Sequence, residues 1–383
     1  MTLQLHGITW DHTRGFTSVV ACAQRYHEYH PAVDVVWEKR SLQAFADFSL
    51  EQLIDDYDLL VIDHPWIGEA ARKGWLIALE ASVSHGMLKD LQNQSVGHSY
   101  ESYRYDGQQW ALPIDAAAPV ASWRPDLLEK SGLQRPRCWA DLLHLAQHSR
   151  MILAAKPIDL LMDFYMLVAA MDSRWMQNNR VAADETIKTA LEHLRELVSL
   201  CPPEVLAFNP IDVYEAMTGN DQFVYCPFAY GYVNYARTGY AKRRLAFGDI
   251  VRWDEKTPLA SVLGGTGLAV SSRSVHVDEA IRFTEFVCSR EVQIGLYAWA
   301  GGQPALKAVW EDDEWNRITG EYYRATRPAL DRAVVRPRYP GYLAFQDAAA
   351  TLVHDYVAHG GHAAKLAGEI NRQYREASKG NAL

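Results

Sequence analysis

The sequence predicts an α/β protein of two lobes, and three observations lead to this fold class. Apolar, strand-like segments at residues 3–10, 33–37 and 58–63 alternate with segments of helical spacing. The chain has 383 residues, which is too long for one average hydrophobic core. After Pro113 the alternation gives way to helix-rich sequence. This combination is typical of an open parallel sheet followed by a second body.

The first 63 residues predict strand, helix, strand, helix, strand. Val19, Val20 and Ala23 recur at helical spacing after the first strand, and Pro31 is expected to end that helix. Residues 58–63 form an unbroken apolar run, typical of a strand with both faces covered. Helical crossovers of this kind join parallel strands.

Residues 107–133, GQQWALPIDAAAPVASWRPDLLEKSGL, predict the place where the chain leaves the first lobe. They contain a turn, a short strand interrupted by Pro113, a second strand, and a helix that begins at Pro125. Proline confines a strand to a sheet edge or a crossover. We therefore expect a hinge near residues 112–118.

The remaining chain predicts mainly helices with a few strands. Residues 139–200 are helical, with the clearest amphipathic stripe at 185–200, and residues 222–235 hold a strand that runs into a Tyr-rich loop. A Gly-Gly turn at Gly264 precedes another strand, and residues 310–340 are polar and contain prolines. Closing helices run to about Ala377.

Composition excludes several classes of partner. The net charge of −9 and pI near 5.9 argue against nucleic acid, because a phosphate-binding surface needs clustered Lys and Arg. The sequence lacks the run of roughly 18 apolar residues that membrane insertion requires. A strand is expected from Leu3 onward rather than a secretory signal, so the chain as written is expected in the cytoplasm, and in the periplasm if a signal segment was removed.

The cysteines and glycines give no reason to expect a cofactor or metal. Five scattered cysteines without a CxxC pair argue against a disulfide framework and a thiolate zinc site, and favour reduced thiols. The GGTG at Gly264 lacks the remaining residues of a P-loop or dinucleotide fingerprint. We expect either a tight turn there or close approach of the backbone to a ligand.

Two Asp-His pairs follow predicted strands. Asp11-His12 comes after the first strand and Asp63-His64 after the third. Ligands of open α/β sheets lie beyond the carboxyl ends of strands, so both pairs are expected at one cleft edge, where they can hydrogen-bond a polar ligand. Alternatively, each Asp caps the helix that follows it. A metal site lacks helical HxxxH spacing, and a general-base role lacks a GxSxG nucleophile.

The order of motifs resembles that of bacterial extracellular solute-binding proteins of carbohydrate-type ABC importers. One matching block is GQQWALPIDAAAPVASWRPDLLEKSGLQRPRCWADLL, from Gly107, and the other is GGTGLAVSSRSVHVDEAIRFTEFVCSREVQIGLYAWAGGQPALKAVWED, from Gly264. The two blocks lie in the family's order and separation. The similarity extends over nearly the whole chain.

The resemblance implies a periplasmic-binding-protein-like fold of two lobes, each a sheet flanked by helices, joined by a hinge that the chain crosses more than once. The first lobe would combine residues 1–112 with 261–312, and the second 113–260 with 313–383. It also implies aromatic residues that line the cleft. Together with the Asp-His pairs, the expected ligand-binding residues are Asp11, His12, Arg14, Asp63, His64, Asp115, Trp123, Tyr230, Tyr232, Gly265 and Trp299.

The function that the resemblance implies is capture of a small polar solute, a sugar or related polyhydroxy compound, with closure of the lobes around it. The partners would be this small-molecule ligand and, if the protein is exported, the permease subunits of an ABC importer. No catalytic residue is assigned. The alternative is a cytoplasmic enzyme or ligand sensor on the same fold that uses its Asp-His pairs as acid–base groups.

Overall fold

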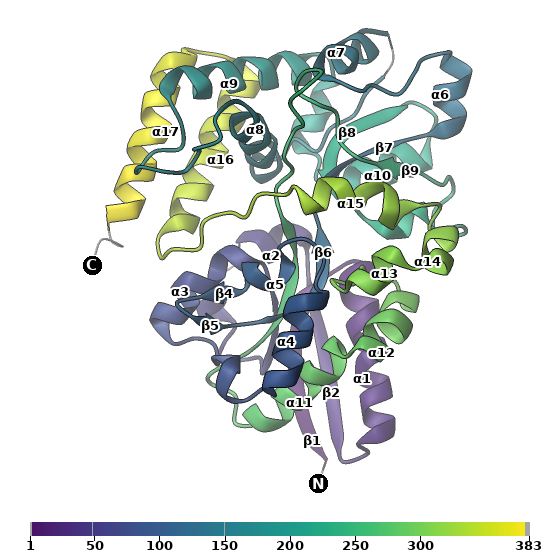
Figure 1. Cartoon of the computed structure of the whole chain (residues 1–383), viewed down its shortest axis with the longest axis vertical. Helices are drawn as coiled ribbons and strands as arrows, with labels where there is room; N and C mark the ends of the chain where they lie inside the picture. The colour runs from purple at the N-terminus through teal and green to yellow at the C-terminus, as the bar shows by residue number, and fades with distance from the viewer. Residues whose placement is uncertain (1, 48, 149, 380–383) are drawn as a thin grey trace.

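The computed structural model describes residues 2–47, 49–148 and 150–379. It shows an α/β protein of two lobes, each built on a sheet flanked by helices (Figure 1). This confirms the predicted fold class. The first lobe has a five-stranded sheet in the order β2-β1-β3-β10-β6. Its strands are β1 (Leu3–Trp10), β2 (Val33–Arg40), β3 (Leu59–Ile62), β6 (Leu112–Ala117) and β10 (Gly264–Val270).

The three N-terminal strands are parallel, as the sequence predicts. Strand β1 pairs with β2 from Leu3 opposite Val33 onward, and with β3 at Gly7 and Ile8. Helix α1 (Ser18–Tyr29) connects the first two and ends just before Pro31. All four residues of β3 are buried, because helices cover both faces of this part of the sheet.

Short helices surround the first sheet. They are η1 (Thr13–Thr17), α2 (Leu42–Asp47), η3 (His64–Trp66), α3 (Ile67–Lys73), α4 (His85–Gln94), α5 (Ser99–Ser102), α11 (Val277–Cys288) and α12 (Arg290–Val292). A small hairpin, β4 (Arg104–Tyr105) with β5 (Gln108–Gln109), lies beside them.

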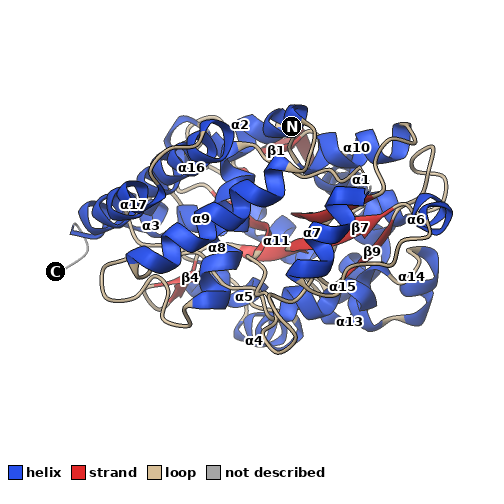
Figure 2. Cartoon of the chain, turned by 90° about the horizontal axis from the view of Figure 1, so that it is seen from above, coloured by secondary structure: helices blue, strands red, loops and turns tan. Residues whose placement is uncertain are grey.

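The second lobe has a three-stranded antiparallel sheet in the order β8-β7-β9. Helix α9 buries the expected stripe of Ile187, Leu191, Leu194 and Val198. Figure 2 shows the helices gathered around this sheet. The elements are β7 (Pro119–Trp123), β8 (Tyr225–Tyr230), β9 (Ala246–Gly248), α6 (Pro125–Ser131), α7 (Trp139–His148), α8 (Pro157–Met171), α9 (Asp184–Ser199), α10 (Pro210–Gly219), α16 (Tyr342–His359) and α17 (Ala363–Ser378).

The chain passes between the two sheets at the predicted hinge. Strand β6 belongs to the first sheet and β7 to the second, and only Ala118 separates them. Pro113 lies in β6, which is an edge strand, as expected for a proline in a sheet. The exact boundaries of the two lobes stay a prediction.

The structure differs from the sequence analysis at two places. Residues 310–340, for which the sequence indicated no helix or strand, are largely helical, in α13 (Lys307–Glu311), α14 (Asp313–Ile318) and α15 (Tyr322–Asp331). The Asp312 side chain caps α14 by accepting a hydrogen bond from the Trp315 amide. In the sequence this capping residue is hard to recognise, because other acidic residues surround it. The glycines at 264 and 265 do not form a turn; they begin β10, which pairs with β6 and contains a bulge after Thr266.

The five cysteines are free thiols, and four of them are buried. Within the described residues, no helix is long and apolar enough to span a membrane.

Candidate functional site

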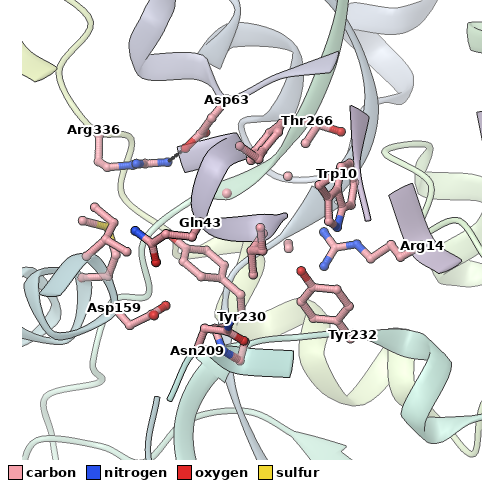
Figure 3. Close-up of a pocket in the computed structure, with 18 residues that line it drawn as sticks. Trp10, Arg14, Gln43, Asp63, Asp159, Asn209, Tyr230, Tyr232, Thr266 and Arg336 are labelled. Carbon is pink, nitrogen blue, oxygen red and sulfur yellow. Dashed lines mark hydrogen bonds and ion pairs between the residues drawn. The ribbon is translucent and has the colours of Figure 1, made fainter. Parts of the chain in front are cut away.

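A cavity of about 130 Å³ lies where the two lobes meet (Figure 3). Residues that follow β1 and β3 line it from the first lobe, and residues from α8, α10 and the end of β8 line it from the second. The lining residues are Trp10, Arg14, Leu42, Gln43, Phe45, Asp63, Ala117, Ile158, Asp159, Met162, Asn209, Pro210, Tyr230, Tyr232, Gly264, Gly265, Thr266 and Arg336.

Arg14 reaches the cavity from the turn after β1. Its side chain is buried and forms a bidentate ion pair with Asp115 on β6, with Nε donating to Oδ2 over 2.8 Å. Its Nη1 donates to the backbone oxygen of Gly231, 2.8 Å away in the second lobe. The guanidinium also lies 4.6 Å from the ring centre of Tyr232, within cation–π range.

The environment keeps Arg14 fully charged. Burial alone would lower its pKa, but the adjacent Asp115 carboxylate outweighs burial and raises the pKa above its usual value. Because the positive charge is matched by Asp115, this corner of the cavity carries no net charge. Asp115 itself does not line the cavity; it lies behind Arg14.

Asp63 and Arg336 form a second ion pair, with Oδ2 and Nη2 2.6 Å apart, in which Arg336 is buried and Asp63 is partly buried. Burial raises the cost of ionising Asp63, but Arg336 outweighs it, and the pKa of Asp63 lies below its usual value. Arg336 also donates to Gln346 Oε1 over 3.1 Å. Arg336 was missed in the sequence because it stands in a Pro-containing stretch between two helices.

Asp63 also acts as a helix cap, the alternative role expected for it. Its Oδ1 accepts a hydrogen bond from the backbone of His64, at the start of η3. In the first pair, by contrast, His12 is the cap, since its Nδ1 accepts from the Arg14 amide over 3.0 Å. Asp11 is exposed and pairs with Lys39, 2.8 Å away.

The two histidines lie behind the cavity wall. His12 packs edge-on against Tyr232, and its Nε2 lies 3.2 Å from the hydroxyl of Tyr240. Burial lowers the pKa of His12 to about 3 and that of His64 to about 4, so both rings are neutral at neutral pH. Neither ring lines the cavity. Of the four residues in the two pairs, the structure brings only Asp63 to it.

The predicted aromatic residues divide into two groups. Tyr230 and Tyr232 line the cavity, together with Trp10 and Phe45, which the sequence reasoning missed. Trp123 instead stacks on Tyr225, and the Arg135 guanidinium lies over its ring, 4.8 Å from the ring centre. Trp299 is 59% exposed and packs against Trp315. Neither tryptophan lines the cavity.

Glycines at the start of β10 bring the backbone close to the cavity. A Cβ at Gly264 would lie 2.4 Å from the Tyr230 ring, and one at Gly265 would lie 2.3 Å from the Asp115 carbonyl oxygen. Gly265 also has φ of 96°, which other residues rarely adopt. These contacts explain the glycine pair without a turn.

Four polar atoms of the cavity lining are buried and have no hydrogen-bond partner among the described residues. They are Nε1 of Trp10, the hydroxyl of Tyr230, Oγ1 of Thr266 and Nε of Arg336. Buried polar groups are rarely left unpaired in native proteins, because the lost hydrogen bond to water is costly. Groups of this kind around a cavity are suited to bind a polar ligand.

Asp159, on the first turn of α8, is the other charged residue of the lining that the sequence reasoning missed. It is 9% exposed, and burial raises its pKa to about 7. A signal was present in the sequence, because Asp159 and Asp163 interrupt an otherwise apolar helix. Acidic residues on a buried helical face need a partner or a function.

The arrangement can hydrogen-bond and stack against a ligand. No group of three or more His, Cys, Asp or Glu side chains within the described ranges is placed to hold a metal ion. The two histidines that could act as bases are enclosed and do not reach the cavity. The geometry therefore gives the acid–base alternative no support.

Known proteins resemble the chain in both sequence and structure. A family model described as bacterial extracellular solute-binding protein matches residues 23–319. The maltose-bound MalE3 protein of T. maritima superposes with a TM-score of 0.84 at 19% identity, over 98% of this chain and all of that one. An ABC transporter solute-binding protein of Thermotoga lettingae TMO, bound with α-D-tagatose, gives 0.83 at 17% identity over 98% and 100% of the two chains. One from Agrobacterium radiobacter K84, in complex with ribitol, gives 0.78 at 16% identity over 98% of each.

Proposed function

Because the chain belongs to the bacterial extracellular solute-binding proteins, we propose that it captures a small polyhydroxy solute, a sugar or polyol, in the cavity between its lobes. One observation carries the proposal: unpaired polar atoms of Tyr230, Thr266 and Arg336 surround a cavity that also exposes aromatic rings. The hydroxyl groups of a sugar or polyol can hydrogen-bond to the unpaired polar atoms, and its C–H faces can pack on the aromatic rings.

The charges of the cavity support this class of ligand over an anion. Both arginines of the lining are already paired with carboxylates, Arg14 with Asp115 and Arg336 with Asp63. An anionic ligand would therefore find no uncompensated cation there. The volume of about 130 Å³ favours a ligand of one sugar unit over an oligosaccharide.

Contacts between the lobes support a cycle of opening and closure. Arg14 is bonded to Gly231, and the Tyr240 hydroxyl lies 3.2 Å from His12 Nε2 and donates to Thr13 Oγ1 over 3.3 Å. We propose that these contacts hold the lobes together around a bound ligand and break when the lobes open. We propose residues 1–112 with 261–312, and 113–260 with 313–383, as the two moving bodies, turning about the β6–β7 junction.

The family is extracellular by description, and several similar structures are binding proteins of ABC transporters. We therefore propose that the protein works in the periplasm or outside the cell. There it would deliver its solute to the permease subunits of an ABC importer. This corresponds to the exported form considered in the sequence analysis.

Isothermal titration calorimetry and thermal melting against maltose, D-tagatose, ribitol, D-glucose and sorbitol test the proposal. A bound solute at 100 times its Kd adds about 2.7 kcal/mol of stability, which a melting curve detects. Tyr230→Phe and Thr266→Val should each weaken binding about tenfold, while Val275→Thr, at an exposed position, serves as the control. If no compound binds at millimolar concentration, the proposal fails.

A further inference from the structure

One charged residue of the cavity lining has no ion-pair partner of opposite charge among the described residues. Four charged side chains line it: Arg14, Asp63, Asp159 and Arg336. Arg14 pairs with Asp115, and Asp63 pairs with Arg336. The Asp159 carboxylate has no hydrogen-bond or ion-pair partner among residues 2–47, 49–148 and 150–379. It is therefore the one carboxylate of the described lining that forms no ion pair.

The orientation of Asp159 suits contact with a ligand. The residue is nine-tenths buried, so bulk water does not solvate its carboxylate freely. Figure 3 shows the carboxylate projecting from the α8 side into the pocket, near Tyr230 and Asn209. An isolated buried carboxylate is costly, and this cost falls when a cation binds.

The positive charge of Lys156, which precedes α8, lowers the pKa of Asp159, but the effect of burial is larger. The Lys156 ammonium lies 4.0 Å from Asp212, at the start of α10. Asp163, one helical turn after Asp159, is buried, and its Oδ2 has no partner in the described chain. Burial raises the pKa of both acids, and that of Asp159 to about 7. The charged and titratable groups around Asp159 are Lys156, Asp163, Asp212, Tyr230 and Tyr232.

We propose that Asp159 selects a solute that carries an amino group, and that the ligand is an amino sugar or amino polyol whose ammonium pairs with this carboxylate. The inference rests on the proposed function, since it names the substrate class of the same cavity. The hydroxyl groups of the ligand would bond to Tyr230, Thr266 and Arg336, and its ammonium to Asp159. A charged hydrogen bond in a desolvated site contributes more than a neutral one.

Matched ligand pairs test the proposal by calorimetry: D-glucosamine against D-glucose, D-galactosamine against D-galactose, and 1-amino-1-deoxysorbitol against sorbitol. N-acetyl-D-glucosamine adds an uncharged nitrogen for comparison. At pH 8, where its amine is still protonated, 1-amino-1-deoxysorbitol should bind about 10- to 100-fold more tightly than sorbitol, and the two amino sugars are compared with their neutral partners at pH 7. Asp159→Asn should remove this preference, whereas the matched control Asp163→Asn on the same helix should keep it.

The pH dependence gives a second readout on the unmodified protein. The amine of 1-amino-1-deoxysorbitol is a primary alkylamine like that of lysine, and it stays largely protonated over the whole range up to pH 8. Its affinity should therefore rise as the pH increases from 5.5 to 8, because Asp159 loses its proton in that range. If a protonated Asp159 instead donated to a neutral hydroxyl, affinity would fall over the same range, and the inference would be wrong.

The remaining outcomes separate this inference from the proposed function. Equal binding of amino and neutral compounds would overturn the role of Asp159 and leave solute capture intact. An amine preference that survives Asp159→Asn would also overturn it. If no compound of either set bound, both the inference and the proposed function would fail.

Discussion

Arg14 and Asp115 form a buried bidentate ion pair at the junction of the two lobes. They are 101 positions apart in the sequence, on the turn after β1 and on the last strand before the hinge. The same guanidinium also donates to Gly231 in the second lobe. The pair therefore links the cavity wall, the hinge strand and the opposite lobe.

Arg14→Met should destabilise the protein by about 3 to 5 kcal/mol, because it leaves the Asp115 carboxylate buried and uncompensated. Urea denaturation measures the loss. The double variant Arg14→Met with Asp115→Leu should recover part of it. As a control, Arg25→Ala breaks the exposed pair with Glu28 and should cost no more than about 1 kcal/mol. Equal losses at Arg14 and Arg25 would contradict the structural role of the buried pair.

Gly264→Ala should displace the Tyr230 ring, since the new Cβ would lie 2.4 Å from it. Affinity for a bound solute is expected to fall by about tenfold or more, which corresponds to at least about 1.4 kcal/mol. Calorimetry measures this change. Gly86→Ala is the matched control: it lies in α4, a Cβ there meets no atom within 4 Å, and alanine favours a helix. Unchanged affinity in Gly264→Ala would show that Tyr230 does not need its present position.

The fold could be predicted largely from local patterns. Periodicity identified the parallel strands, and Pro113 marked the edge strand at the hinge, because these signals lie within one segment of the chain. The helices at residues 313–331 were missed, because α14 depends on the Asp312 cap and α15 contains Pro328. The composition of a charged segment that contains proline does not distinguish a helix from irregular structure.

The site could be predicted only in part, because it depends on contacts across the whole chain. Arg336 pairs with Asp63 from 273 positions away, and no local pattern indicates such a partner. The Asp-His motif correctly marked strand ends, yet only Asp63 reaches the cavity. A side chain at a strand end can turn toward the cleft or into the wall behind it. Packing against residues such as Tyr232 decides which, as it does for His12.

The two buried histidines should make the protein less stable in mild acid. The pKa of His64 is lowered to about 4 and that of His12 to about 3, against about 6.5 in an unfolded chain. Below pH 6.5 the unfolded state takes up protons that the folded state refuses, so the free energy of unfolding falls as the pH drops toward 4. Each histidine contributes at most about 1.4 kcal/mol per pH unit.

Urea denaturation between pH 4.5 and 7.5 measures this dependence. His64→Gln should flatten the curve below pH 6.5, whereas His85→Gln, at an exposed position, should leave its slope unchanged. An identical slope in wild type and His64→Gln would mean that His64 is not held neutral by burial.

The contact of Tyr240 with His12 and Thr13 should control how long the lobes stay closed. Its hydroxyl lies 3.2 Å from His12 Nε2 and 3.3 Å from Thr13 Oγ1, and it bridges the lobes at a partly exposed position. Tyr240→Phe removes the hydroxyl and keeps the ring. Since a net hydrogen bond contributes about 0.5 to 1.5 kcal/mol, the solute dissociation rate should rise about two- to tenfold.

Stopped-flow measurement of intrinsic fluorescence would follow release, because Trp10 lines the cavity. Tyr29→Phe, at an exposed position of α1, is the matched control and should not change the rate. A rate unaltered in Tyr240→Phe would place the barrier to opening elsewhere, with the Arg14 contact to Gly231 as the next bond to test.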